Sequence, residues 1–216
     1  MSKKYSILQL SLTLLFTVSL VICNIITTKQ VQLPFGIVTT GGFFIFPITY
    51  ILSDVFSEVY GYKWSRYTCY FGFLANLFAV LVFTFVIHTP SPAYFENAGA
   101  FATVLGSTPR VLFASLTAFV MGDFVNDKVF AKMKLSHMND HKGFGARAIL
   151  SSLFGEMTDS LIFYPLCFFG QLPFETLLTM MATEVIIKTS YEVLVLPLTK
   201  IVMTKVSKIE GVNPND

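Results

Sequence analysis

Long apolar runs, each close to the length needed to cross a bilayer, are the feature that most constrains this sequence. A hydrocarbon core of about 30 Å requires roughly 20 apolar residues in an α-helix. Six such runs, separated by polar segments, are Ile7 to Thr27, Phe35 to Ser57, Thr68 to His88, Arg110 to Asn126, Ala148 to Gly170 and Thr176 to Ile201. We therefore predict an all-α integral membrane protein, a bundle of six transmembrane helices that forms a single domain over residues 1–216.

The composition agrees with a membrane protein and excludes several other classes. Hydrophobic residues make up 54% and charged residues 13% of the chain, whereas a soluble domain carries roughly 25% charged residues. The net charge of +2 is not gathered on one face, so we expect no nucleic-acid partner. Cys23, Cys69 and Cys167 lie in separate apolar stretches, which argues against a disulfide framework or a thiolate metal site. We expect no cofactor.

The basic residues set the orientation, because Lys and Arg collect in short cytoplasmic loops. With the N-terminus inside, the cytoplasmic set is Lys3, Lys4, Lys63, Arg66, Lys128, Lys132, Lys134, Lys142, Arg147, Lys200, Lys205 and Lys208. Only Lys29 and Arg110 fall on the opposite side, and Lys188 lies within a span. The sequence thus predicts that both termini are cytoplasmic. The connection over residues 89–109, with three prolines, predicts an irregular outer loop.

A polar stripe runs along the second span at helical spacing: Pro47, Tyr50, Asp54, Ser57, Glu58 and Gly61. An ionisable group at membrane depth costs at least about 2.5–3.5 kcal/mol, so such groups face protein or water. Asp54 is the deeper of the two acids, while Glu58 has a second interpretation as an interfacial partner of Lys63. Gly41 and Gly42 are expected to loosen the helix and expose backbone groups to a cavity.

The fifth and sixth spans carry the remaining deep charges. Glu156 and Asp159 are three residues apart on one helix face, so either a cation or a proton must relieve their repulsion. In the sixth span, Glu184, Lys188 and Glu192 share a face at intervals of four residues. Two interpretations of Lys188 follow: an ion pair within its own helix, or a functional pair with Asp159 or Glu156.

Single polar residues in the other spans complete the candidates. Asp123 lies in the fourth span, with Asn126 nearer its inner end. Asn24 and Asn76, in the first and third spans, either contact a ligand or bind one helix to another.

The segment Phe46-Pro-Ile-Thr-Tyr-Ile-Leu-Ser-Asp-Val-Phe-Ser-Glu-Val-Tyr-Gly61, followed by Lys63 and Arg66, resembles the signature of the queuosine precursor transporter family. Supporting similarity covers nearly the whole chain: Asn24-Ile-Ile, Ala114-Ser115, Asp123, Arg147, Ser151-Ser152, Asp159 and Lys188. Two positions depart from the family pattern. Glu156 stands where many members have Gln, and Gly122 stands where a longer hydrophobic residue is common.

This resemblance implies a multi-pass protein of the inner membrane that imports 7-deazaguanine precursors of queuosine, such as 7-cyano-7-deazaguanine or 7-aminomethyl-7-deazaguanine. Its partners would be membrane lipid and a small purine-like molecule. One carboxylate can accept from the ring N–H and the adjacent amino group, while an aromatic ring stacks on the base. The candidate substrate-binding residues are Asn24, Tyr50, Asp54, Glu58, Asp123, Glu156, Asp159 and Lys188. Proton coupling and passive transport both stay open, as do a monomer and a homodimer.

Two other functions compete with this hypothesis. A substrate-binding subunit of an energy-coupling-factor vitamin transporter also has about six helices, but the first span, Leu8 to Ser19, lacks the Ala-x-x-x-Ala docking pattern of such subunits. A membrane-embedded enzyme would need a metal or a nucleophile, for which the candidates are His137, Asp140 and His141 in a polar loop. We expect a solvated loop there and no enzymatic activity.

Overall fold

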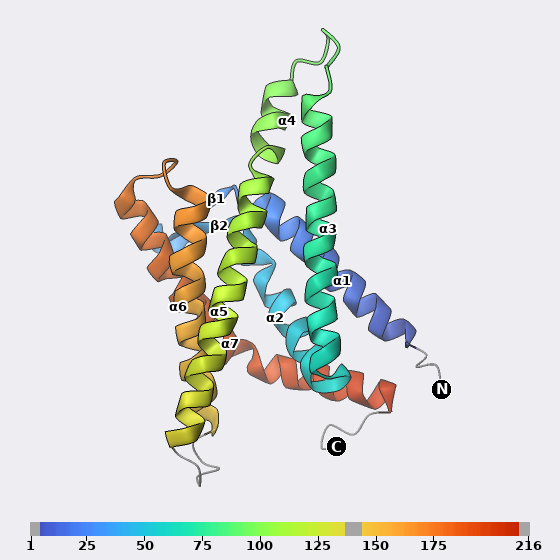
Figure 1. The fold of residues 1–216 in the computed structure, drawn as a ribbon, viewed down its shortest axis with the longest axis vertical. Coiled ribbons are helices and arrows are strands. Elements are labelled where there is room, and N and C mark those ends of the chain that lie inside the picture. Colours follow the sequence, from blue (N-terminus) through green and yellow to red (C-terminus); the bar gives the residue numbers. More distant parts are fainter. Residues whose placement is uncertain (1–4, 137–143, 212–216) are drawn as a thin grey trace. The chain divides into compact units, whose positions relative to one another are not determined.

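The computed structural model describes residues 5–136 and 144–211, which are almost entirely helical (Figure 1). The α-helices are α1 (Ile7–Ile26), α2 (Phe46–Val55), α3 (Tyr62–His88), α4 (Ala98–Leu105), α5 (Thr108–Ser136), α6 (Phe144–Phe168) and α7 (Phe174–Glu210). The shorter elements are β1 (Gln30–Gln32), η1 (Pro34–Gly36), β2 (Val38–Thr40), η2 (Gly41–Phe44) and the π-helical turn η3 (Phe56–Tyr60).

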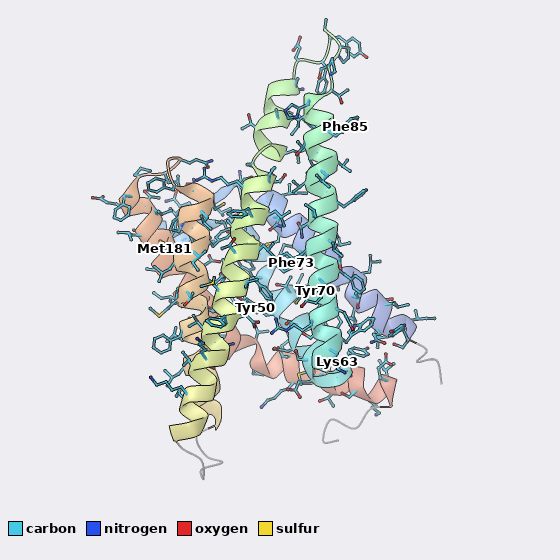
Figure 2. All side chains as sticks on the ribbon, viewed as in Figure 1. Tyr50, Lys63, Tyr70, Phe73, Phe85 and Met181 are labelled. Carbon is cyan, nitrogen blue, oxygen red and sulfur yellow. The ribbon has the colours of Figure 1, made fainter. Side chains whose placement is uncertain are left out.

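The apolar helices confirm the expected class, an all-α membrane protein. Within the described chain, three helical stretches are long and apolar enough to cross a membrane: Ile7–Ile26, Lys63–His88 and Ala98–Asn126. Large apolar side chains on α3 are exposed, including Phe78 at 70% and Phe85 at 74% (Figure 2). An exposed apolar surface of this kind suits contact with lipid. The helices α6 and α7, at 25 and 37 residues, are long enough to cross a membrane but are more polar than these three stretches.

The second predicted span, Phe35 to Ser57, is wrong as one continuous helix. Its first part, up to Phe44, contains η1, β2 and η2, and β2 pairs with β1. A side chain on Gly41 would lie 2.4 Å from the carbonyl oxygen of Ile26, so only glycine permits this contact with the end of α1. The helix then begins at Phe46, with Pro47 in its first turn, where the missing N–H costs nothing. The prediction that the glycines loosen this span is confirmed.

The helical part of this span is consequently short. The 10 residues of α2 and the 5 residues of η3 cover at most about 22 Å at the helical rise, less than a bilayer core of about 30 Å. Gly61, with φ of 85°, ends the segment.

Two further boundaries differ from expectation. The outer connection is not fully irregular, because it contains α4, which packs on α3. The last helix continues past Ile201 to Glu210.

The chain divides into two compact units. Unit 1 contains Met1–Gln30, Thr40–Pro109 and Glu192–Asp216. Its core joins Phe16 of α1 to Leu52 and Phe56, and a second cluster joins Val55 and Val59 to Val206.

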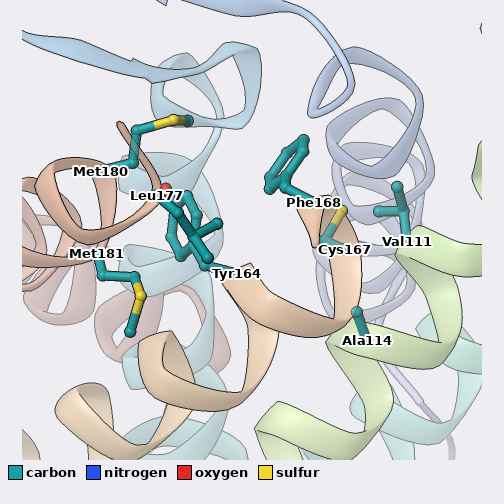
Figure 3. Close-up of a cluster of buried hydrophobic side chains, with 8 residues drawn as sticks. All are labelled: Val111, Ala114, Tyr164, Cys167, Phe168, Leu177, Met180 and Met181. Atoms are coloured by element: carbon teal, nitrogen blue, oxygen red, sulfur yellow. The ribbon is translucent and has the colours of Figure 1, made fainter. Parts of the chain in front are cut away.

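Unit 2 contains Val31–Thr39 and Arg110–Tyr191, and therefore α5 beyond its first two residues, α6 and the first half of α7. Its hydrophobic cluster takes side chains from all three helices (Figure 3). Its members are Val111, Ala114, Tyr164, Cys167, Phe168, Leu177, Met180 and Met181. Tyr164, only 1% exposed, brings a hydroxyl group into this apolar surrounding and must find a partner for it.

Arg110 fixes the end of α6 within unit 2. The last carbonyl groups of a helix have no partner inside the helix. The Arg110 side chain donates from Nε to the carbonyl oxygen of Leu166 at 2.6 Å and from Nη2 to that of Phe169 at 2.8 Å. One guanidinium therefore joins α5 to the end of α6.

We expect Arg110→Met to lower the free energy of unfolding by about 2 kcal/mol, because it removes two charge-assisted hydrogen bonds, of which one is solvent-exposed. Thermal unfolding of the purified protein in detergent measures the loss. The control is Lys205→Met, which removes the same charge from an exposed position of α7. Equal melting temperatures for the two variants would contradict this role of Arg110.

Candidate functional site

A buried ionic network in unit 2 is the main polar feature of the described chain. The ammonium of Lys188, on α7, donates to Oδ2 of Asp159, on α6, at 2.9 Å. The same nitrogen lies 3.8 Å from Oε1 of Glu184, one turn earlier on α7. Both expected contacts of Lys188 are present, one within its own helix and a shorter one between helices. A functional role of the contact between helices stays a prediction.

Glu184 has partners on two other elements. Its Oε2 accepts from the hydroxyl of Tyr164 at 3.0 Å and from Oγ1 of Thr39 at 3.3 Å. Tyr164 thereby satisfies the hydroxyl that it buries in the hydrophobic cluster. Since Thr39 lies on β2, the strand segment, α6 and α7 all converge on one carboxylate.

The two acids differ in their access to solvent. The side chain of Glu184 is 4% exposed and that of Lys188 10%, whereas that of Asp159 is 28% exposed. A molecule that approaches the network can therefore reach Asp159 more easily than Glu184.

Two buried hydroxyl groups, on residues adjacent in sequence to members of the network, lack a hydrogen-bond partner within residues 5–136 and 144–211. They are Oγ of Ser160, next to Asp159, and Oγ1 of Thr189, next to Lys188. A buried hydroxyl without a partner costs about 1–3 kcal/mol. Bound water or a polar ligand would remove this cost.

A close approach of α5 to α6 sets the position of Asp159. A side chain on Gly122 would lie 3.0 Å from the carbonyl oxygen of Gly155 and 3.3 Å from Cβ of Asp159. A side chain on Gly155 would lie 3.0 Å from Cβ of Asn126. The paired glycines thus let the two helix backbones meet beside the acid.

The predicted site residues divide equally between the units. Unit 2 holds Asp123, Glu156, Asp159 and Lys188, and unit 1 holds Asn24, Tyr50, Asp54 and Glu58. Within unit 2, the structure brings Asp159 and Lys188 into direct contact. The predicted pairing of these two residues is confirmed, and their contact with a substrate stays a prediction.

In unit 1, Asn24 donates from Nδ2 to Oδ1 of Asn76 at 2.7 Å, which joins α1 to α3 as expected for an interhelical amide pair. The ring of Tyr50 lies 6.4 Å from that of Phe46. Asp54 on α2 and Glu58 on η3 are exposed, so neither is sealed inside this unit.

His137, Asp140 and His141 lie outside the described residues. Within the described part of the chain, no group of three or more His, Cys, Asp or Glu side chains could hold a metal ion.

Sequence reasoning missed four residues, Thr39, Tyr164, Ser160 and Thr189, and it treated Glu184 only as a neighbour of Lys188. The spacing of four residues on α7 already indicated Glu184. Tyr164 follows Ser160 by four residues, so the two share a face of α6. Because Tyr164 lies in an apolar run, the sequence did not indicate that its hydroxyl group binds a carboxylate. Thr39 could not be found, because its contact depends on the break in the second span.

Comparison with known proteins indicates a family of membrane transporters. A family model described as "Putative vitamin uptake transporter" matches residues 40–202. A Bacillus subtilis (strain 168) protein named "Probable queuosine precursor transporter" is 26% identical over 180 residues, which cover 82% of this chain and 76% of that protein. The "Queuosine precursor transporter" of Escherichia coli (strain K12) is 26% identical over 159 residues, which cover 71% and 68%. No solved structure matches.

We expect Gly122→Ala to lower the free energy of unfolding by about 1–3 kcal/mol, because the new methyl group meets the α6 backbone and Asp159. Thermal unfolding measures the change. Gly99→Ala is the matched control, since a side chain there meets no atom within 4 Å and the helix α4 gains propensity. An unchanged melting temperature for Gly122→Ala would show that α5 and α6 do not meet this closely.

Proposed function

Because the chain belongs to the vitamin uptake transporter family, whose model matches three quarters of its length, we propose that it imports queuosine precursors across the inner membrane. The cargo would be 7-deazaguanine bases such as 7-cyano-7-deazaguanine or 7-aminomethyl-7-deazaguanine. The names of two relatives support this substrate class. The protein is a transporter by family, and its described residues supply no reason to assign it a reaction.

The buried network of unit 2 is the observation that best supports a carrier. Charged groups at membrane depth persist where they line a path for polar cargo. Asp159 is the carboxylate that cargo can reach, and a deazaguanine ring offers it an N–H and an amino group side by side. Ser160 and Thr189 would supply further polar contacts. Asp123 and Glu156 are the further proposed substrate contacts within unit 2. Asn24, Tyr50, Asp54 and Glu58 are the proposed substrate contacts within unit 1.

The proposed topology has six membrane segments with both termini in the cytoplasm, as the positions of the basic residues favour. The second segment is the shortened one, formed by α2 and η3 after the β1–β2 hairpin. Irregular backbone at membrane depth is tolerated where it faces protein or a water-filled cavity. The hairpin therefore supports a polar chamber near the start of this segment.

Proton coupling belongs to this proposal, because Asp159 and Glu184 both lie beside the ammonium of Lys188. The 7-cyano form is neutral, whereas the 7-aminomethyl form carries an ammonium that can pair with a carboxylate itself. We expect the pH gradient to accelerate uptake of the 7-cyano form more than that of the 7-aminomethyl form.

Uptake of both labelled bases into liposomes that contain only the purified chain tests the function. We expect saturable uptake without ATP, faster when the outside is acidic, and none in protein-free liposomes. Uptake that requires a co-purified ATPase module would favour the alternative, a substrate-binding subunit of an energy-coupling-factor transporter. Absence of uptake under both conditions would contradict the proposal.

Asp159→Asn is expected to raise the KM for uptake about tenfold, because an amide cannot accept two hydrogen bonds from the base as a carboxylate does. Labelled uptake over a range of cargo concentrations measures the change. Glu175→Gln, on the exposed first turn of α7, is the control. If amide variants of Asp54, Asp123, Glu156 and Asp159 all transport normally, the proposed site is wrong.

A further inference from the structure

We propose that Glu184 is a second counter-ion of Lys188, which receives the lysine ammonium when cargo binds to Asp159. This inference rests on the proposed function and deepens it. It assigns Glu184, Tyr164 and Thr39 to the transport step as positioning residues, without contact to the cargo.

Two carboxylates lie near the Lys188 ammonium at different distances. At 2.9 Å, the contact with Asp159 is a hydrogen-bonded ion pair. At 3.8 Å, the contact with Glu184 is electrostatic only. Closing the second contact to hydrogen-bond length takes about 1 Å of movement. A lysine side chain has four rotatable bonds and can make this movement while α6 and α7 stay in place.

Glu184 is oriented for this role before the lysine arrives. Both of its protein donors, the Tyr164 hydroxyl and Thr39 Oγ1, bind the same oxygen, Oε2. The other oxygen, Oε1, is the one that lies toward Lys188. The carboxylate is therefore held by β2 and α6, and its orientation does not depend on the ion pair.

The different burial of Asp159 and Glu184 assigns them different roles in this proposal. Asp159 is seven times as exposed as Glu184, at 28% against 4%, so cargo meets Asp159. When cargo occupies that carboxylate, Lys188 loses part of its compensation in a surrounding where a buried charge without a partner costs several kcal/mol. Movement of the Lys188 ammonium toward Glu184 restores the compensation of its charge. It therefore lowers the free-energy cost of breaking the ion pair with Asp159.

The contact with Thr39 connects this transfer to the strand β2. Arrival of the ammonium at Glu184 changes the charge that the Thr39 and Tyr164 hydroxyl groups bind. The orientation of both donors therefore responds to the position of the lysine.

A double-mutant cycle on thermal stability tests the shared lysine without any cargo. Asp159→Asn and Glu184→Gln each leave one of the two carboxylates beside Lys188, and the double variant removes both. We expect the fall in Tm of the double variant to exceed the sum of the single shifts. The matched control pairs Asp159→Asn with Glu175→Gln, which should be additive. Additive shifts in both cycles overturn the inference, whether or not the chain carries cargo.

Uptake kinetics test the transfer itself and stay informative if the double variant does not fold. We expect Glu184→Gln, Tyr164→Phe and Thr39→Val to lower Vmax at least about threefold with KM unchanged, in contrast to the KM effect of Asp159→Asn. Thr39→Ser keeps the hydroxyl and should restore Vmax. A raised KM for Glu184→Gln, or normal Vmax for all three variants, overturns the inference. Absence of uptake by the unaltered chain overturns instead the proposed function.

Discussion

The compensation of one buried ammonium, that of Lys188, is the interaction on which the polar network of unit 2 depends. In a chain that is 54% hydrophobic, a lysine that is 10% exposed can persist only beside an acid. That requirement brings α6 and α7 together at Asp159, and it places Glu184 one turn away. Tyr164 and Thr39 then follow, because a buried carboxylate also needs donors for its second oxygen. A single electrostatic constraint thus explains why four polar side chains gather around Lys188 in an otherwise apolar unit.

The backbone meets the same constraint in the second predicted span. A backbone segment in lipid that is not helical loses the hydrogen bonds within the helix, yet residues 30–44 contain no α-helix. The β1–β2 pairing recovers part of the loss, and the N–H of Gly41 donates to the carbonyl oxygen of Lys29 at 2.8 Å. Glycine is required at that point, because the chain passes directly against the Ile26 carbonyl. These hydrogen bonds offset part of the free-energy cost of interrupting the helix, and the resulting strand places Thr39 in contact with Glu184.

The sequence was sufficient for features that depend on composition and helical period, and insufficient for those that depend on contacts distant in the chain. The first span was placed to within one residue, since hydropathy alone defines α1. The pairing of Lys188 with Asp159 was among the expected alternatives, because few partners exist for a charge at that depth. In contrast, α4 forms where a short segment packs on α3, and no period reveals a helix of 8 residues. The contact of Thr39 required the three-dimensional position of a strand that the length of the apolar run had assigned to a helix.

Two departures from the family pattern fall at the contact between α5 and α6, and this location gives them a physical meaning. Gly122 replaces the longer side chain common in the family, and its backbone meets Gly155, the residue before Glu156. A larger residue at position 122 would hold the helices further apart. Here the smaller residue draws α5 toward the acids of α6, while Glu156 adds a carboxylate where an amide is common. Glu156 and Asp159 are three residues apart, so the added carboxylate lies on the face of α6 that carries Asp159.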